Sequence, residues 1–203
     1  MGQDAEGVGK ITDSMMDDLF LRAASELLRQ GSVLSWAALE VFSTDLFVQL
    51  LNLVPDLSIN LLDDERTNKR FQLRNVALRT VHDFGYDLSK KMGNLFVQRQ
   101  SIGSTEVMRD VFDVLCPESR PLRTLLQHDR LWLLNQRRNL IVHKRAVVDH
   151  FYLAATGEQL ALGSTVEITP SDIEVDLHLV RDVGIELLTA LPARLTIVDG
   201  PAH

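Results

Sequence analysis

Residues 131–143 read Leu-Trp-Leu-Leu-Asn-Gln-Arg-Arg-Asn-Leu-Ile-Val-His, and this stretch decides the expected fold. Drawn as a helix together with the leucines that precede it from Leu122 onward, it carries apolar side chains on nearly every side. A helix that is apolar all round is buried against several others. We therefore expect a central helix over about 119–142, packed inside a bundle of helices.

Other helical patterns flank this central helix in the sequence. Apolar residues at helical spacing predict further helices over about 12–30, 32–54, 104–115 and 170–191, and one that begins near residue 69. Gly31 and Pro55 are expected to end the first two of these. Thr169-Pro170-Ser171-Asp172 is a strong start for the last helix, because it combines a capping threonine, an early proline and an acid three residues on.

Between the central and last helices the pattern changes. Short apolar runs separated by Gly157 and Gly163 predict extended segments within 151–169, and hence a small β-hairpin. We find no internal repeat and no linker rich in Gly, Ser or Pro. The expected architecture is all-α: one helical domain over 12–196 with a hairpin before the last helix, a disordered segment 1–11 and a flexible tail 197–203.

Composition restricts the class of protein. With 203 residues, 45% of them hydrophobic, the chain can bury a substantial core. Cys116 is the only cysteine, which excludes an internal disulfide and favours a reducing compartment. The first dozen residues lack the apolar run of a secretory signal, so a cytoplasmic location is expected. The most apolar window, 46–54, is too short to span a bilayer, and no membrane partner is expected.

The charge of the chain is unevenly distributed. The net charge of −7 argues against general nucleic-acid binding. Residues 118–145, however, hold seven basic and two acidic residues, a net of +5, whereas residues 146–203 hold two basic and nine acidic residues. A local basic region can still attract an anionic substrate. Arginines that pair with surrounding carboxylates explain the same distribution equally well.

The end of the central helix carries the residues with the clearest chemistry. Arg138 offers a permanent cation with a planar fork of donors that fits a phosphate. His143, five residues later, can give and take protons near neutral pH. Asn139 can contact the phosphate or hold the histidine ring. A cation for phosphate and a proton carrier are a minimal set for cleaving RNA without a metal ion.

These residues resemble the signature of the HEPN superfamily, Arg-x(4–6)-His, in which a polar residue commonly follows the arginine. Here Arg138, Asn139 and His143 fit it, at the end of a long helix. An early helix with Leu39-Glu40-Val41-Phe42 and a closing helix extend the likeness over most of 32–192. The resemblance implies a helical bundle that forms a symmetric dimer with both signatures in one cleft. Many members cut RNA without metal, as toxins of toxin–antitoxin pairs or in defence, whereas others have lost the chemistry.

Neighbouring residues extend the expected site. Arg137 is an alternative to Arg138 in the signature and, with Lys144, Arg145 and Tyr152, a candidate RNA contact. No cofactor is expected. A metal site at His143 and His150 with Asp149 between them matches no ligand spacing, and no metal is expected.

Spacing favours a site made by two chains. Five residues at about 100° each put Arg138 and His143 roughly 140° apart around an ideal helix. Either the helix loosens before His143, or the arginine and the histidine of one site come from different subunits. We therefore expect a homodimeric endoribonuclease, with RNA and, for a toxin, an antitoxin protein as partners. The alternative is a non-catalytic HEPN-like module that binds a protein or a nucleotide.

Overall fold

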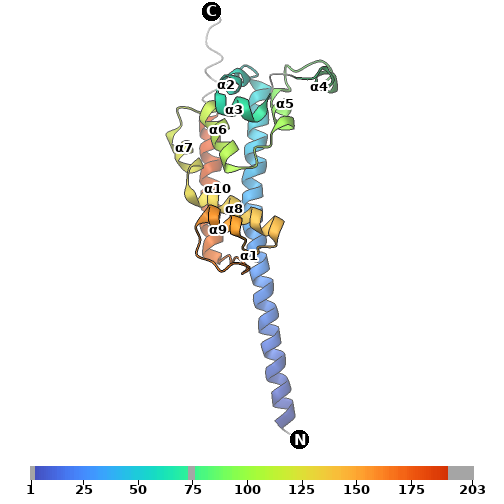
Figure 1. Cartoon of the computed structure of the whole chain (residues 1–203), viewed down its shortest axis with the longest axis vertical. Helices are drawn as coiled ribbons and strands as arrows, with labels where there is room; N and C mark the ends of the chain where they lie inside the picture. The colour runs from blue at the N-terminus through green and yellow to red at the C-terminus, as the bar shows by residue number, and fades with distance from the viewer. Residues whose placement is uncertain (1–2, 73–75, 192–203) are drawn as a thin grey trace, which may run out of the picture.

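The computed structural model describes residues 3–72 and 76–191, with side chains from Met15 onward, and these residues form ten helices (Figure 1). The helices are α1 (Gln3–Leu53), α2 (Leu57–Asp63), α3 (Glu65–Phe71), α4 (Leu78–Asp83), α5 (Met92–Arg99), α6 (Thr105–Leu115), α7 (Arg120–Leu126), α8 (Asp129–Lys144), α9 (His150–Thr156) and α10 (Pro170–Ala190). The expectation of an all-α fold is confirmed. The expected tail 197–203 lies outside the described residues, and segment 1–11 is helical from Gln3 on.

Helix α1 is a single helix where two were expected, because Gly31 does not end it. A Cβ added at Gly31 would lie 3.3 Å from Cδ1 of Ile173, so the glycine sits where α10 comes close to α1. The next turn buries Ser32, Ser35 and Trp36. An internal glycine costs about 1 kcal/mol relative to alanine. Burial of Trp36 alone outweighs that cost, so the helix continues.

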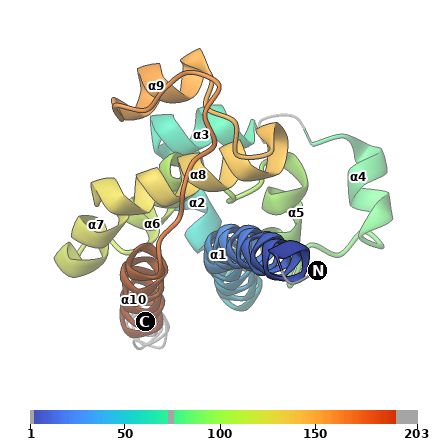
Figure 2. The ribbon, with the colours of Figure 1, turned by 90° about the horizontal axis from the view of Figure 1, so that it is seen from below.

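Three long helices give the molecule its frame. Helices α1 and α10 lie side by side, and α8 crosses them (Figures 1 and 2). The short helices α2, α3, α5 and α6 gather around the C-terminal half of α1. The N-terminal part of α1 extends beyond this body, and every described residue from Met15 to Leu27 is exposed there. The chain thus has a packed body and a projecting helix.

Two apolar clusters hold the body together. The larger cluster centres on three aromatic rings, Phe47 of α1, Phe71 of α3 and Phe96 of α5, whose centroids lie 4.7–6.0 Å apart. The smaller cluster lies under the end of α8. It consists of Leu140, Ile141, Ala146, Val148, Tyr152, Val166 and Ile168, with Leu28 and Val33 of α1 packed against it. This second cluster anchors the end of α8 to the middle of α1.

The expected central helix is two helices. Ser119 caps α7, and the imidazole Nδ1 of His128 accepts from the backbone N–H of Arg130 to cap α8. The chain turns at Gln127 and His128 between them. Leu122 and Leu126 are buried on one face of α7, whereas Leu131 and Leu134 are buried on one face of α8. Drawn as a single helix, these two apolar faces together look like a helix that is apolar all round.

The expected β-hairpin within 151–169 is wrong. Asp149 accepts a hydrogen bond from the backbone N–H of Tyr152 at 2.8 Å and starts α9, so the first expected strand is helical. Residues 157–169 are irregular, and in the described chain the sole strand-like pairing is one antiparallel bridge between Val147 and Thr165. Val166 and Ile168 instead bury their side chains in the smaller cluster, which accounts for their apolar character without a sheet.

Other boundaries also differ from expectation. The helix expected from residue 69 into the eighties is two short helices, α3 and α4, separated by a segment that includes residues outside the described chain. The last helix begins as expected, with the reciprocal capping box of Thr169 and Asp172. Ser104 caps α6, also as expected. Local capping chemistry was therefore the most reliable signal of helix starts.

By length and composition alone, α1 over Met15–Leu53 is apolar enough to cross a membrane. Its middle, however, contacts α5, α8 and α10 and buries Trp36, Leu39 and Phe47. The central helix of a bundle needs the same apolar composition. Burial in the core accounts for part of this hydropathy, because 33% of the most apolar window is buried.

Two glycines provide a test of the packing. A Cβ on Gly93 would fall well inside contact distance of the backbone of Val48, whereas one on Gly184 would lie 3.6 Å from the ring of Phe42, an ordinary contact. We expect Gly93→Ala to lower the free energy of unfolding by roughly 2 kcal/mol, because α5 must move away from α1. Gly184→Ala should be neutral or raise it by up to about 1 kcal/mol through helix propensity. Urea denaturation measures both, and equal effects would contradict the packing of α5 on α1.

Candidate active site

The end of α8 presents the signature residues on different sides. The Arg138 guanidinium points toward α1, where its Nη2 lies 3.8 Å from Oε2 of Glu40. Its Nη1 donates to the side-chain oxygen of Asn139 at 3.0 Å. The side chain keeps 27% of its surface exposed, and its Nε is buried with no partner in the described chain. Arg138 is therefore held in place but still reachable from solvent.

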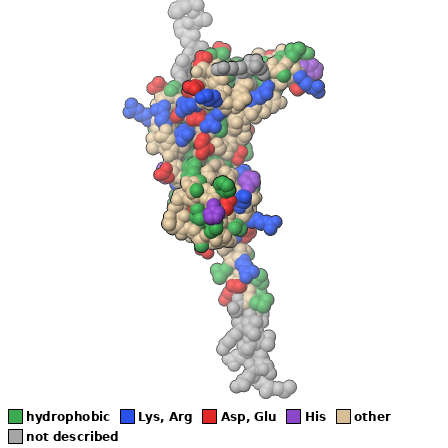
Figure 3. Space-filling model, viewed as in Figure 1, with side chains coloured by type: hydrophobic (Ala, Val, Ile, Leu, Met, Phe, Trp, Pro, Cys, Tyr) green, Lys and Arg blue, Asp and Glu red, His purple; other side chains and the backbone are tan. Residues whose placement is uncertain are grey.

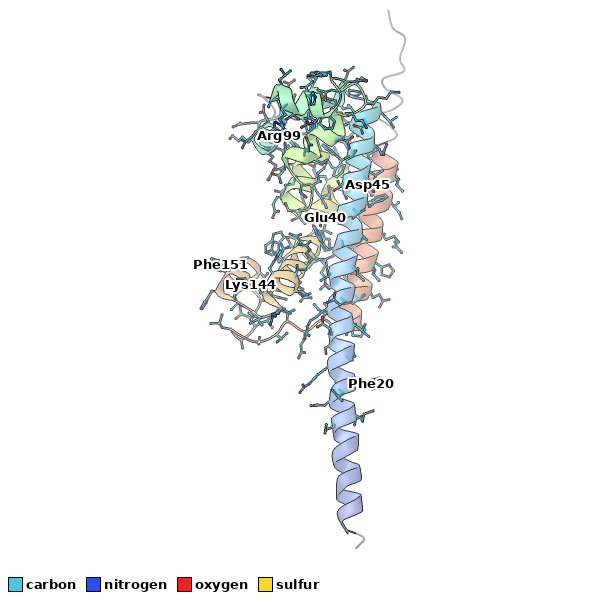
Figure 4. All side chains as sticks on the ribbon, turned by 90° about the vertical axis from the view of Figure 1, so that its right-hand side faces the viewer. Phe20, Glu40, Asp45, Arg99, Lys144 and Phe151 are labelled. Carbon is cyan, nitrogen blue, oxygen red and sulfur yellow. The ribbon has the colours of Figure 1, made fainter. Side chains whose placement is uncertain are left out.

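Glu40 is seated by a loop from elsewhere in the chain. A Cβ at Gly103 would overlap the Glu40 carboxylate, so the glycine that precedes α6 leaves the space which this carboxylate fills. Glu40 thus lies between the 101–104 loop and α8 (Figure 4). Glu40 is therefore the carboxylate that pairs with Arg138.

His143 lies in the last turn of α8 and is exposed. No hydrogen bond or ion pair joins it to another described residue, and it does not contact Arg138. The helix remains regular through Lys144 and ends at Arg145 and Ala146, which both have positive φ angles. The backbone N–H of Ala146 donates to the carbonyl of Leu140 at 3.1 Å. Because α8 does not loosen before His143, one chain does not bring the two signature residues together.

The other expected RNA contacts divide into two groups. Lys144 and Arg145 are exposed at the end of α8, and Lys144 lies 3.8 Å from the carboxylate of Asp149. Arg137 and Tyr152 instead point into the protein. Arg137 bonds Oε1 of Glu158 at 2.7 Å and Oδ1 of Asp172 at 3.2 Å, and the hydroxyl of Tyr152 donates to Glu158. These two residues stabilise the fold beside the signature and do not face solvent.

Arg137 and Tyr152 belong to a network that sequence reasoning missed. Arg130 of α8 completes it, with bonds of 2.8 Å to Asp172 and 2.6 Å to the fully buried Asp176 of α10. The network joins α8, the loop after α9 and α10. In the sequence, Asp172 was visible only as a helix cap, and nothing in the spacing of Arg130, Glu158 and Asp176 linked them.

Burial and hydrogen bonding set the pKa values in this network. Burial raises the pKa of Tyr152, and its hydrogen bond to Glu158 raises it further. Burial also raises the pKa of Asp176 above its usual range, despite the bond from Arg130. Burial would raise the pKa of Asp172 too, but bonds from Thr169 and Arg130 hold it well below its usual range. Asp172 is therefore charged wherever the protein is folded near neutral pH.

Two further observations concern cofactors and hollows. Among the side chains of residues 15–72 and 76–191, no three from His, Cys, Asp or Glu cluster in a way that could hold a metal ion. One open hollow lies between α7 and α10, lined by Pro121, Leu125 and Ile185 and edged by Asp182 and Glu186. Its acidic edge does not suit an RNA backbone.

Comparison with known proteins adds no further assignment. No protein-family model, no curated protein and no solved structure matches the chain.

The pH dependence of stability tests the contribution of Asp172 to this network. A carboxylate whose pKa is depressed in the folded state contributes stability above its unfolded pKa, and this contribution is lost as pH falls. We expect Asp172→Asn to be less stable than the native chain at pH 7, and the difference to shrink as pH falls below about 4. Thermal denaturation across that range measures it. Asp182→Asn is the matched control, because Asp182 lies on the same helix and, within the described residues, pairs only with its neighbour Arg181. A constant difference between Asp172→Asn and the native chain would contradict this role.

Proposed function

We propose that this chain is a HEPN-type endoribonuclease that works as a homodimer, with Arg138 and His143 as its catalytic residues. The observation that carries the proposal is the state of these side chains at the end of α8. Arg138 is fixed by Asn139 and Glu40 while part of its fork faces solvent, and His143 is exposed with no partner in the described chain. A fixed cation and an available imidazole are what phosphodiester cleavage by the 2′-hydroxyl requires.

The chemistry follows from the two side chains. His143 accepts the proton of the ribose 2′-hydroxyl as its oxygen attacks the adjacent phosphorus. Arg138 stabilises the negative charge that grows on the phosphate oxygens. The bond from phosphorus to the 5′-oxygen then breaks, and that oxygen takes a proton from water. The products are a 2′,3′-cyclic phosphate and a 5′-hydroxyl.

The surface near His143 supports pairing of two chains at this site. Phe151 is 86% exposed, the most exposed large apolar side chain of the described residues. Val142 and Val147, also exposed, are close to it in sequence. We call Val142, His143, Val147 and Phe151 the α8–α9 corner. Figure 4 draws Lys144 and Phe151 on one side of α1, and Figure 3 shows hydrophobic and histidine side chains together where Figure 1 places α9. An exposed apolar corner favours an interface.

A dimer through this corner would bring together an arginine and a histidine that point in different directions within one chain. Arg138 faces α1 and His143 faces solvent within one chain, so a phosphate bound to Arg138 needs a histidine from outside. A two-fold axis at the α8–α9 corner would bring His143 of a second chain to it. Lys144 and Arg145 would then flank the RNA backbone at both copies of the site.

One observation favours a second candidate function. Glu40 already engages the fork of Arg138, and the chain has a net charge of −7. Both fit a HEPN-like module that has kept the bundle and binds a protein or nucleotide without cleaving RNA. Activity measurements distinguish the two functions.

We expect His143→Ala to lower the rate of RNA cleavage by roughly 10² to 10⁴, the usual contribution of a general base. Arg138→Ala should cause a similar loss, and Arg138→Lys should recover only part of it, because an ammonium lacks the bidentate fork. His150→Ala is the control, since His150 is another exposed histidine only seven residues away. Gel assays of a labelled RNA measure each rate.

The same assay has three outcomes that decide against the proposal or its mechanism. Loss of cleavage in EDTA would show that a metal ion is required. Cleavage of a substrate with 2′-deoxyribose at the scissile position would exclude attack by the 2′-hydroxyl. If the native chain cuts no RNA, the binding module is the better assignment.

Charge at the α8–α9 corner should weaken the active dimer. Phe151→Asp places a charge in the apolar contact, so we expect its cleavage rate per chain to fall at low protein concentration and recover as concentration rises. Val175→Asp, at a similarly apolar exposed position on α10, should behave as the native chain. A loss that concentration does not reverse would assign Phe151 to RNA binding or folding, not pairing.

A further inference from the structure

A second apolar surface lies on α1, away from the signature. Four large side chains recur on α1 every seventh residue, Phe20, Leu27, Leu34 and Val41, and they are 77%, 73%, 67% and 60% exposed. We call these four residues the α1 stripe. The contact line of a coiled coil carries residues at two positions of each seven-residue repeat, and the second position here is small, Ala24, Gly31 and Ala38. The described chain places no element over the four large side chains, while Ile173 of α10 approaches the line at Gly31.

The stripe has defined limits. On an ideal helix it lies opposite the side that carries Trp36, Ser43 and Phe47, all of which are fully buried. It ends where α5 covers the same side of α1, since Gly93 meets the backbone of Val48 and Asn94 bonds Asn52 at 2.8 Å. From Phe20 to Val41 the stripe is about 32 Å long, or six turns.

The projecting part of α1 requires a partner. From Met15 to Leu27 every described residue is exposed, so no tertiary contact stabilises these turns. Helices of this length are marginal in water unless an apolar face is buried. Two ion pairs here lie within the same helix, Arg22 with Asp18 and Arg29 with Glu26. Its exposed apolar side chains are covered by no element of the described chain, and they comprise Phe20 and Leu27 of the stripe together with Met15, Met16, Leu19 and Leu21.

The stripe matches a second copy of itself. Beside its large residues α1 exposes three alanines, Ala23, Ala24 and Ala38. Small residues next to large ones give a face with both ridges and gaps, so the ridges of one helix fit the gaps of an identical one. A self-complementary patch is what a two-fold interface between identical chains requires.

We infer that the α1 stripe is a self-association surface, on which α1 of a second copy of this chain packs as a coiled-coil pair. The pairing does not depend on nuclease activity. Glu40 lies about 100° around α1 from the adjacent stripe residue Val41, so Arg138 and its neighbours stay uncovered. With the α8–α9 corner as a second two-fold contact, each chain has two surfaces for its own copies, and the closed assembly that follows contains four chains.

Charged residues placed on the α1 stripe should halve the mass of the assembly. We expect sedimentation equilibrium to give the double variant Leu27→Glu, Leu34→Glu half the mass of the native full-length chain, which is 22.9 kDa per protomer. Leu21→Glu is the matched control and should leave the mass unchanged. Leu21 is also 67% exposed on the same bare part of α1, but points about 120° away from Leu27.

Cross-linking gives a second measurement on a folded chain. Leu27→Cys alone, or Leu27→Cys combined with Leu34→Cys, should form disulfide-linked dimers on mild oxidation, whereas Leu21→Cys should not. The inference would be overturned if the double variant has the same mass as the native chain and neither stripe position forms a cross-link. A monomer whose stripe binds phosphatidylcholine vesicles, and loses that binding in the double variant, would also overturn it and assign the stripe to a membrane.

Failure of the α1 pairing and failure of the nuclease proposal give different results. If the pairing on α1 is wrong, His143→Ala still abolishes cleavage while the stripe variants leave the mass unchanged. If the nuclease proposal is wrong, no variant cuts RNA, but the double variant still halves the mass.

Discussion

Everything at the end of α8 depends on a small set of buried charges. Arg130 and Arg137 reach across to Glu158, Asp172 and Asp176. Removing either arginine leaves an acid without a basic partner in the described chain, Asp176 in the case of Arg130 and Glu158 in the case of Arg137. Breaking a buried pair typically costs about 3–5 kcal/mol. Such a network fixes geometry more than it adds net stability. Here it holds α10 and the loop after α9 against α8, and so sets the direction in which Arg138 and His143 point.

The network also separates two adjacent arginines by role. Arg137 and Arg138 are chemically identical and both fit the signature pattern, yet neighbouring positions on a helix point about 100° apart. Arg137 points to the partly buried acids Glu158 and Asp172, and Arg138 points to Glu40 and solvent. Substitution at Arg137 would therefore disturb folding first. Any loss of activity that follows would not show that Arg137 touches RNA.

The sequence allowed the fold class, the cap of α6 and the start of α10 to be predicted, because capping boxes and helical spacing are local signals. The hairpin and the single central helix were wrong for one reason. Apolar residues buried by irregular chain or by two short helices look the same in sequence as those in strands or one long helix. Long-range pairs such as Arg130 with Asp176 leave no periodic trace, so the buried role of Arg137 and Tyr152 was not predictable.

We propose that one working site uses Arg138 of one chain and His143 of another, and mixing two inactive variants tests this sharing most directly. Arg138→Ala and His143→Ala chains are each purified, then mixed in equal amounts under conditions that allow exchange of subunits. If the site is shared, half of the dimers are mixed and each has one intact site, so activity should return to roughly a quarter of the native rate. If the mixture stays as inactive as its components while the subunits have exchanged, each site lies within one chain and the shared site is wrong.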